Sequence, residues 1–209
     1  MSRQQVLAKV ATDQRTDKER EVLDVATEYF LAHGFTGTSI SAMARDAGIS
    51  KESIYRYFSS KKELFEAVIE RELHAYQEKL HSLDIEFDSI PLDIALTKTA
   101  ESILEVVTTD RTLGLRRLIF QESRHSPEIG QYYYEIGPRE AYRNLEHIFE
   151  FHKDEFTLGP EKLANYFVAM VLHHAMLIRQ CGVAGPLSKA KASELAVEAT
   201  SDFVEAFTR

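Results

Sequence analysis

Apolar residues recur at helical spacing from about residue 18 onward. Val22, Ala26 and Phe30 fall on one side of a helix predicted over Lys18–Ala32, and Gly34 follows it as a stop signal. Positions 40, 43, 44 and 47 are apolar at i, i+3, i+4 and i+7, which predicts a second, short helix. The ordered chain is therefore expected to begin with two helices that are separated by a short connection containing glycine and threonine, residues 35–38.

A third and a fourth helix are predicted directly afterwards. Gly48 ends the second helix and Ser50 is a residue type that caps helix N-termini, so a third helix is predicted over Lys51–Phe58, with Ile54 buried. Ser60 is another candidate cap and opens a fourth helix that continues the apolar stripe. The tight turn at Gly48 is expected to bring the second and third helices together.

The rest of the chain keeps the helical spacing, and no run alternates with the period of two that marks a half-buried strand. Helices are predicted over Pro91–Thr108, Thr112–Arg124, Glu128–His152, Pro160–Gln180 and Ser188–Phe207. The predicted fold class is all-α. A small module over residues 18–64 precedes a larger helical domain over residues 65–209, and residues 1–17 are expected to form a flexible N-terminal arm.

The composition is that of a globular protein, with 44% hydrophobic and 28% charged residues. Cys181 is the single cysteine, so an internal disulfide is excluded, and the first residues lack the apolar segment of a secretory signal. These two features favour the cytoplasm. The longest apolar run, Tyr166–Ile178, is shorter than the roughly 20 residues that span a bilayer, so we expect a buried helix there and no membrane partner.

The net charge of −8 is unfavourable for binding an anion, but the charge is unevenly divided along the chain. Residues 1–62 carry 10 lysines and arginines against 8 acidic residues, whereas residues 63–209 carry 15 against 25. An anion-binding face is therefore expected in the N-terminal module, and the acidic remainder is not expected to touch phosphate.

The third predicted helix has the chemistry to contact DNA. Two short helices joined by a glycine turn and braced by a longer one can place a helix in the major groove, where basic and hydroxyl side chains bind bases and phosphates. Lys61 and Lys62 follow at the start of the fourth helix, whose N-terminus favours anions. On spacing alone, a charged and solvated helical hairpin fits equally well. The candidate DNA-binding residues of this helix are Ser50, Lys51, Glu52, Ser53, Tyr55, Arg56 and Tyr57.

Four stretches of this module resemble the DNA-binding domain of the TetR family of bacterial regulators. They read EVLDVATEYF (residues 21–30), GFTGTSI (34–40), MARDAGIS (43–50) and SIYRYFSSKKEL (53–64). The resemblance covers about 50 residues in order and without gaps, and it is specific as an ensemble. Met43 departs from the isoleucine that the family more often has, a change of side-chain shape that a core tolerates.

The resemblance implies a helix-turn-helix regulator in which Thr38–Ala47 crosses the DNA backbone and Lys51–Phe58 is the recognition helix. Thr38, Tyr55, Tyr57 and Lys61 match positions that usually contact phosphate in the family. Ser50, Lys51, Glu52, Ser53 and Arg56 occupy the variable positions from which base specificity comes. The implied protein is a repressor that binds a palindromic operator in double-stranded DNA as a homodimer and is released by a small-molecule effector.

The C-terminal domain carries weaker signals. Residues 115–122 and 127–139 are similar to the ligand domain of an AcrR-like or AefR-like branch of the family. Aromatic residues could line an apolar pocket, and charged residues or histidines on apolar helices could orient a polar ligand group, although an aromatic stripe is more often part of a core. The candidate ligand-binding residues are Arg116, Phe120, Glu122, Tyr132, Tyr133, Tyr134, Tyr142, Phe167, Met170 and His174.

The last two predicted helices are apolar over wider faces than one contact with the rest of the domain requires. In a two-fold dimer they would pair with their copies as a four-helix bundle, and the two recognition helices would meet half-sites about 34–36 Å apart. The alternative is that these faces only close the core of the protomer. The candidate dimer residues are Leu163, Phe167, Val171, Leu195, Ala199 and Phe203.

Two other function classes compete with this interpretation. An enzyme is disfavoured because the sequence has no Gly-x-Ser-x-Gly, no phosphate-binding glycine-rich loop and no His-Glu-x-x-His. Adjacent His173 and His174 project about 100° apart on a helix and do not readily share a metal ion, so no metal or cofactor is expected. A helical interaction module that binds no DNA would suit the negative net charge, but the uneven division of charge argues against it.

Overall fold

The computed structural model describes residues 16–81 and 90–209, without the side chains of residues 75–81. Most of the predicted flexible arm lies outside the described residues. Within them, the only β pairing is the isolated bridge between Phe156 and Thr208, so the predicted all-α class is confirmed. The elements are α2 (Asp17–Gly37), α3 (Ile40–Asp46), α4 (Lys51–Tyr57), α5 (Lys61–His81), α6 (Leu92–Val107), α7 (Asp110–Glu122), α8 (Pro127–Ile136), α9 (Pro138–Phe151), the short 3-10 helix η2 (Lys153–Glu155), α10 (Pro160–Gln180) and α11 (Lys189–Phe207).

Most helices lie within a few residues of their predicted bounds, but the prediction of one helix over Glu128–His152 is wrong. The structure divides this stretch into α8 and α9 at Gly137, whose backbone angles (φ −120°, ψ −90°) are not helical. Pro138 is the first residue of α9. Proline has no N–H to donate, which disrupts a continuous helix but suits the first position of a new one.

The chain divides into two compact units. Among the described residues, the first comprises residues 16–74 together with Gly114–Tyr133, and the second comprises residues 75–81 and 90–113 together with Tyr134–Arg209. The division differs from the sequence-based boundary at residues 64 and 65, because a later segment from α7 and α8 belongs with the N-terminal helices.

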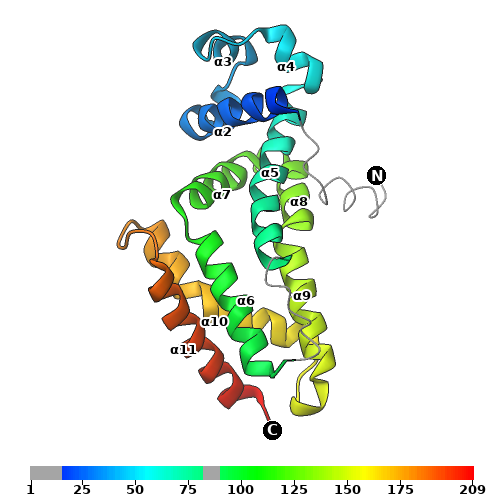
Figure 1. Cartoon of the computed structure of the whole chain (residues 1–209), viewed down its shortest axis with the longest axis vertical. Coiled ribbons are helices and arrows are strands. Elements are labelled where there is room, and N and C mark those ends of the chain that lie inside the picture. Colours follow the sequence, from blue (N-terminus) through cyan, green and yellow to red (C-terminus); the bar gives the residue numbers. More distant parts are fainter. Residues whose placement is uncertain (1–15, 82–89) are drawn as a thin grey trace. The chain divides into compact units, whose positions relative to one another are not determined.

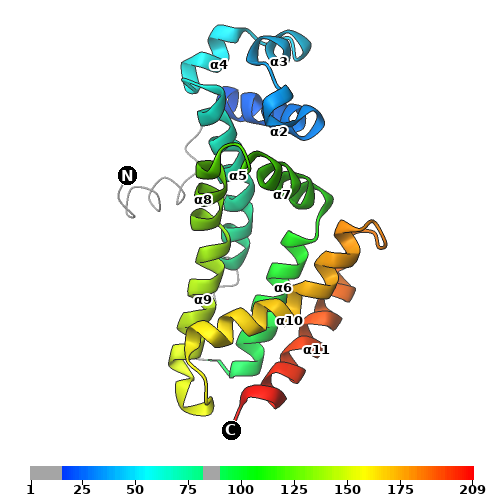
Figure 2. The same ribbon diagram turned by 180° about the vertical axis from the view of Figure 1, so that it is seen from behind.

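In the second unit, α6, α10 and α11 lie side by side (Figures 1 and 2). Four phenylalanines form the centre of its core: Phe149 from α9, Phe156 after η2, Phe167 from α10 and Phe203 from α11. Their contacting rings have centroids 5.1 to 6.3 Å apart. Because a fully buried phenylalanine contributes roughly 1.5–3 kcal/mol, this cluster is a large part of what holds these helices together.

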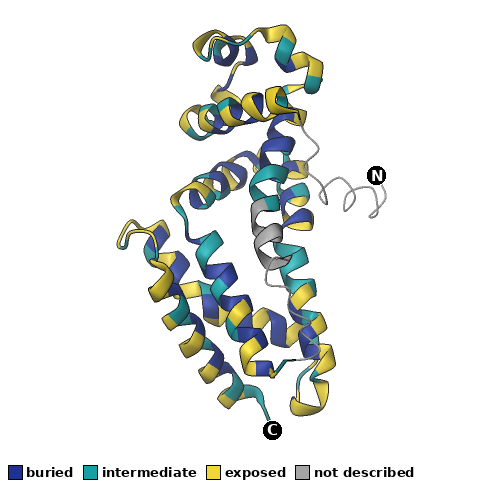
Figure 3. Ribbon diagram, in the orientation of Figure 1, coloured by how far each residue is buried: buried dark blue, intermediate teal, exposed yellow. Residues whose placement is uncertain are grey.

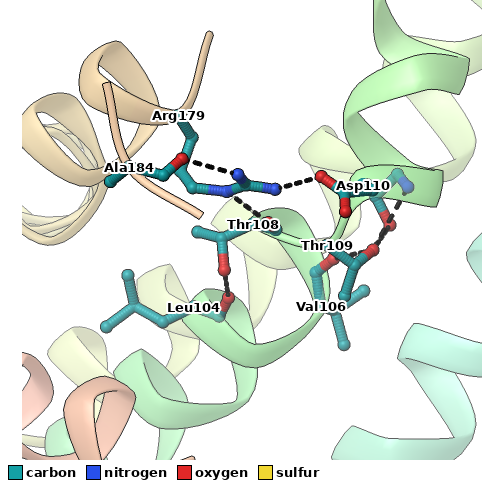
Figure 4. A network of polar contacts seen from close by, with 8 residues as sticks. Leu104, Val106, Thr108, Thr109, Asp110, Arg179 and Ala184 are labelled. Atoms are coloured by element: carbon teal, nitrogen blue, oxygen red, sulfur yellow. Dashed lines mark hydrogen bonds and ion pairs between the residues drawn. The ribbon is translucent and has the colours of Figure 1, made fainter. Parts of the chain in front are cut away.

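A buried arginine fixes the turn between α6 and α7 in the same unit (Figure 4). The side chain of Arg179, near the end of α10, is 5% exposed. Its Nε donates to the carbonyl of Thr108 at 3.0 Å, one terminal nitrogen donates to the carbonyl of Ala184 at 2.8 Å, and the other lies 2.5 Å from the Asp110 carboxylate. These bonds compensate for burying the charge and tie the start of α7 to the end of α10.

The first unit has its own core, built from α2, α3, α4 and the start of α5. Phe30 of α2 and Phe65 of α5 meet with ring centroids 4.9 Å apart, and Phe35 lies 5.0 Å from Phe65. Met43 and Ile54 bring α3 and α4 onto the same core, since both are almost fully buried. The predicted apolar stripes of these short helices therefore meet in one place, which determines the directions in which their polar faces point.

None of the helices in the described parts of the chain combines the length and the apolar character that crossing a membrane requires.

Candidate nucleic-acid interface

The turn between α3 and α4 depends on Gly48. Its φ of +67° lies in the left-handed region, which glycine enters without steric cost. The N–H of Gly48 donates to the carbonyl of Arg45 at 3.2 Å and the N–H of Ile49 donates to that of Ala44 at 3.0 Å, a pair of bonds that satisfies the last carbonyls of α3. Ser50 then caps α4 by accepting from the N–H of Ser53 at 3.0 Å. The chain is thus turned sharply from α3 into α4.

The outer face of α4 is polar and open to solvent, as the burial colouring shows (Figure 3). Lys51, Glu52, Tyr55 and Arg56 are exposed, while Ile54 faces the core. The ammonium group of Lys51 lies 5.6 Å from the centre of the Tyr55 ring. Lysine, glutamate and arginine side chains on one solvent-facing helix surface are groups that can form hydrogen bonds with base edges.

The remaining predicted residues of α4 already have partners within the protein. The hydroxyls of Ser50 and Ser53 lie 2.8 Å apart, so the two side chains bond to each other as well as capping the helix. Tyr57 is half-buried, and its hydroxyl oxygen lies 3.5 Å from the Thr16 hydroxyl that donates to it. Any contact that Ser50 or Ser53 makes with DNA would compete with, or add to, its capping role.

Lys61 holds the last turn of α2 and the residue Thr38 that leads from it into α3. Its ammonium group donates to the carbonyls of Phe35 at 2.8 Å and Thr38 at 2.9 Å, and it lies 4.5 Å from the centre of the Phe35 ring. The Thr38 hydroxyl is itself buried and donates to the carbonyl of Gly34 at 2.6 Å. Since an ammonium group has three donors, Lys61 keeps one that these two carbonyls do not use, whereas the only hydroxyl proton of Thr38 is already used.

Lys62 is exposed beside Lys61, and two carboxylates lie near it. Its nitrogen is 3.9 Å from a carboxylate oxygen of Glu66 and 3.4 Å from one of Glu128, the latter at the start of α8. The backbone hydrogen bond at the Glu128 carboxylate, followed by its bond with Lys62, lowers the pKa of Glu128, while burial raises the pKa of Glu66. A surface ion pair of this kind contributes little to stability, so Lys62 can exchange it for a phosphate.

Two exposed residues of α3 were missed by the sequence analysis. Ser39 is the N-cap residue of α3, and its side chain makes no capping hydrogen bond. Arg45 is exposed and its Nε donates to the carboxylate of Asp46 at 2.9 Å. That bond, with one from the Tyr29 hydroxyl, lowers the pKa of Asp46. Arg45 could have been found from its place opposite the buried positions 40, 43 and 44 of this short helix, and Ser39 from its place at the N-cap.

The predicted ligand residues divide between the two units. Arg116, Phe120, Glu122, Tyr132 and Tyr133 belong to the first unit. The Arg116 guanidinium lies 5.5 Å from the centre of the Phe120 ring, which is half-exposed and meets the Tyr133 ring edge-on with centroids 6.4 Å apart. Burial raises the pKa of Tyr133 and the nearby positive charge of Arg116 opposes that shift. These three side chains form one group with a cation and two aromatic rings.

The other two ligand candidates of this unit have protein partners. The Tyr132 hydroxyl donates to the carboxylate of Glu70. The carboxylate of Glu122 is buried and accepts bonds from Thr36. We therefore do not propose Glu122 as a ligand contact.

The ligand residues predicted in the second unit have varied surroundings. Tyr134, Met170 and His174 are exposed, and Tyr142 is half-buried against the apolar core. Phe167 is completely buried among the phenylalanines of that core. A ligand could reach Phe167 only if these rings moved apart, so we do not propose it as a ligand contact either.

The predicted dimer residues lie in the core of the protomer or at its edge. Leu163, Phe167 and Phe203 have no exposed surface, Val171 is buried, and two further residues are half-buried. Those two are Leu195 and Ala199, which pack against the same core. The structure thus matches the alternative in which these apolar faces close the protomer, and the outward faces of α10 and α11 carry other residues.

Comparisons with known proteins place the chain in a family. Residues 22–68 match the model described as bacterial regulatory proteins, tetR family, and residues 94–209 match the AefR-like transcriptional repressor, C-terminal domain. The HTH-type transcriptional regulator AcrR of Shigella flexneri is 25% identical over 122 residues, which cover 58% of this chain and 55% of AcrR. The chain spans about half the length of AcrR and less than two thirds of the other curated relatives it matches.

Two solved structures are similar over most of the chain. A structure from Mesorhizobium loti MAFF303099, described as a TetR-family regulator, has a TM-score of 0.77 and 25% identity, covering 93% of this chain and all of its own. The flavonoid-responsive regulator FrrA has a TM-score of 0.72 and 26% identity, covering 91% of this chain and 97% of its own. Together with the helix-turn-helix geometry, these matches show that the chain belongs to the TetR family of bacterial transcriptional regulators, which bind DNA and are not enzymes.

Proposed function

We propose that this chain is a cytoplasmic repressor that binds a palindromic operator as a homodimer and is released from it by a small-molecule effector. The observation that carries the proposal is the open polar face of α4, held after a tight turn at Gly48 by a buried anchor at Ile54. Such a helix fits the DNA major groove, and its side chains supply both base-reading and phosphate-binding groups.

We propose different roles for the DNA-binding candidates according to their exposure and hydrogen bonds. Lys51, Glu52 and Arg56 read bases, because their side chains are exposed on α4. Ser50 and Ser53 keep α4 capped and adjust its approach, since their hydroxyls bond to each other. The residues proposed to bind phosphates are Tyr55, Tyr57, Lys61 and Lys62, together with Ser39 and Arg45 at the N-cap and within α3. Thr38 is proposed to contribute indirectly, because its hydroxyl bond to the Gly34 carbonyl fixes the backbone before α3.

We propose that the dimer forms through the outward face of α10. Tyr166, Met170 and Leu177 are 40% to 48% exposed although they are large and apolar. With His173, they stand at i, i+4, i+7 and i+11, which places them on one side of the helix. A second copy of this chain would cover the stripe by two-fold pairing, as the predicted four-helix bundle requires.

The dimer proposal has a direct test. Leu177→Glu should shift sedimentation of the chain from dimer to monomer at micromolar concentration, because a charge would be buried in the paired face. Ile94→Glu is the matched control, since Ile94 is a similarly exposed apolar residue on α6. A Leu177→Glu chain that stays dimeric would remove α10 from the interface.

The effector is proposed to be an aromatic molecule that carries an acidic or phenolic group. Arg116, Phe120 and Tyr133 offer one cation and two aromatic rings on α7 and α8, which suits such a molecule. FrrA, a similar protein, responds to flavonoids, which are phenolic aromatics. A set of flavonoids and aromatic acids should therefore raise the thermal midpoint of the wild-type chain but not of the Phe120→Ala variant.

The experiment that tests the whole proposal is selection of binding sites from a random-sequence duplex pool at physiological salt. The proposal expects a palindrome whose half-sites lie about 34–36 Å apart, and an effector that stabilises the chain should lower the affinity for it. If the selected sites have no two-fold symmetry, binding as a homodimer is refuted. If no stabilising ligand changes the affinity, release by an effector is refuted.

A further inference from the structure

The last residue of α7, Glu122, is a buried carboxylate that no DNA-binding role uses. Its side chain is 3% exposed. One carboxylate oxygen accepts from the Thr36 hydroxyl at 3.0 Å and the other from the Thr36 N–H at 3.4 Å. Burying a carboxylate is unfavourable unless hydrogen bonds replace its hydration. The two hydrogen bonds from Thr36 provide that compensation for Glu122.

Glu122 ends a row of contacts between α7 and α2. Gly114, Leu118 and Glu122 stand at i, i+4 and i+8 and therefore share one face of α7. A Cβ atom added at Gly114 would lie 3.1 Å from Leu31 on α2, and one added at Gly34 would lie 4.0 Å from Leu118. The face thus follows the end of α2 closely, and the absence of a side chain at Gly114 permits the close approach.

The residue that Glu122 holds, Thr36, lies in the last turn of α2, after the kink at Gly34 and shortly before α3. Gly34 has a φ of +75° and interrupts the helix there, and α3 begins at Ile40. Lys61 binds two carbonyls of the same stretch, those of Phe35 and Thr38. A basic side chain from α5 and an acidic one from α7 therefore hold neighbouring residues of one short segment, which leaves that segment little freedom to change direction.

We propose that Glu122 is a positioning residue for DNA recognition: it touches no DNA, but by holding Thr36 it fixes the direction in which α3 and α4 leave α2. A movement of α7 is then transmitted to α3 and α4 through a polar contact between two residues that lie 86 positions apart in the sequence. The inference rests only on contacts within the first unit and does not require that the effector proposal is correct.

The test compares Glu122→Gln and Thr36→Val for affinity to a duplex selected from a random pool by the wild-type chain. Each variant should bind roughly 5- to 30-fold more weakly, within the range of typical coupling between sites. The double variant should bind the duplex with the same affinity as the single variant that binds less tightly, because both changes break the same contact. Thr36→Ser keeps the hydroxyl and should retain wild-type affinity.

Two readouts separate positioning from the alternatives. The slope of log affinity against log salt should equal that of the wild type, since no phosphate contact is lost. Glu150→Gln, on an exposed part of α9, removes the same charge and should leave affinity unchanged. The folded fraction is measured by thermal unfolding at the assay temperature, so that affinity is expressed per folded molecule, and Thr36→Val supplies the test if Glu122→Gln does not fold.

Three outcomes would overturn the inference. Wild-type affinity per folded molecule in Thr36→Val would show that the contact serves stability alone. A shallower salt slope in Glu122→Gln would indicate altered contact with DNA phosphates. Additive losses in the double variant would mean that the two residues act separately.

Discussion

The two compact units of the chain are held together in different ways. In the second unit, long helices share a core of phenylalanine rings, and one buried arginine, Arg179, fixes a turn. In the first unit, two helices of seven residues each depend on a glycine turn, a serine cap and the polar contacts of Lys61 and Glu122. The comparison teaches that the second unit derives its stability from apolar burial, whereas the directions of α3 and α4 in the first unit depend on a few specific polar bonds.

The largest expected effect concerns the phenylalanine core. Phe203→Ala should lower the free energy of unfolding by about 3–5 kcal/mol, because it removes a fully buried ring that contacts four others. Urea denaturation monitored by circular dichroism measures the change. Phe151→Ala is the control, since Phe151 is 55% exposed and its loss should matter by less than about 0.5 kcal/mol. Equal effects of the two variants would refute the importance of this core.

The next effect concerns the buried arginine. Arg179→Met should lower the free energy of unfolding by about 1–3 kcal/mol, because the carbonyls of Thr108 and Ala184 lose their donors. Arg139→Met removes a more exposed arginine paired with Glu146 and should cost less than about 1 kcal/mol. If both replacements have the same effect in urea denaturation, the network in Figure 4 contributes no more than a surface ion pair.

An effect of similar size is expected on base discrimination by α4. It concerns the difference in binding free energy between DNA sequences and not the free energy of unfolding. Arg56→Ala should reduce discrimination at one base pair of each half-site by about 1–3 kcal/mol, because a well-placed arginine contact with guanine has that value. Repeating the site selection with the variant measures this. An unchanged preference would remove Arg56 from the residues that read bases.

A smaller effect is expected at the turn between α3 and α4. Gly48→Ala forces a Cβ into a left-handed conformation at a cost of about 1 kcal/mol, although nothing lies within 4 Å of the added atom. Operator affinity should fall with stability, because the turn fixes the approach of α4. Gly159→Ala is the matched control: its φ is −75° and its Cβ would also meet nothing. Wild-type affinity and stability in Gly48→Ala would contradict the role of the turn.

The smallest effect is expected at a single phosphate contact. Lys62→Ala should reduce the slope of log affinity against log salt by about one and weaken all sequences similarly. Lys189→Ala, at the exposed start of α11, should leave the slope unchanged. A slope that does not change in Lys62→Ala would show that this lysine keeps its carboxylate partners when DNA is bound.

Local signals in the sequence were sufficient to predict the short helices of the first unit, although not that part of α7 and α8 belongs to it. The apolar spacing, Gly48 and the Ser50 cap together locate α2, α3 and α4 because each depends on residues close together in the chain. The bonds of Glu122 and Arg179 could not be predicted, since their partners lie 86 and 71 residues away. The break at Gly137 was missed because apolar spacing continues across it.

The same limitation explains the dimer residues. Periodicity identifies the apolar side of a helix but not whether that side meets the protomer or a second copy. Leu163 and Phe203 pack within the protomer, and the exposed stripe of α10 was missed because it includes Tyr166 and His173 among its apolar residues. Only the exposure of each side chain in the folded protomer distinguishes a core residue from one that is available to a second copy.

Hydrogen–deuterium exchange with and without a selected operator duplex tests most directly whether the first unit reads DNA. We expect slower amide exchange over residues 38–62 on adding the duplex, strongest in α4 and at the start of α5, and unchanged exchange in α10 and α11. Protection confined to α10 and α11, or no protection over residues 38–62 under conditions where the duplex is bound, would contradict the assignment of DNA recognition to these helices.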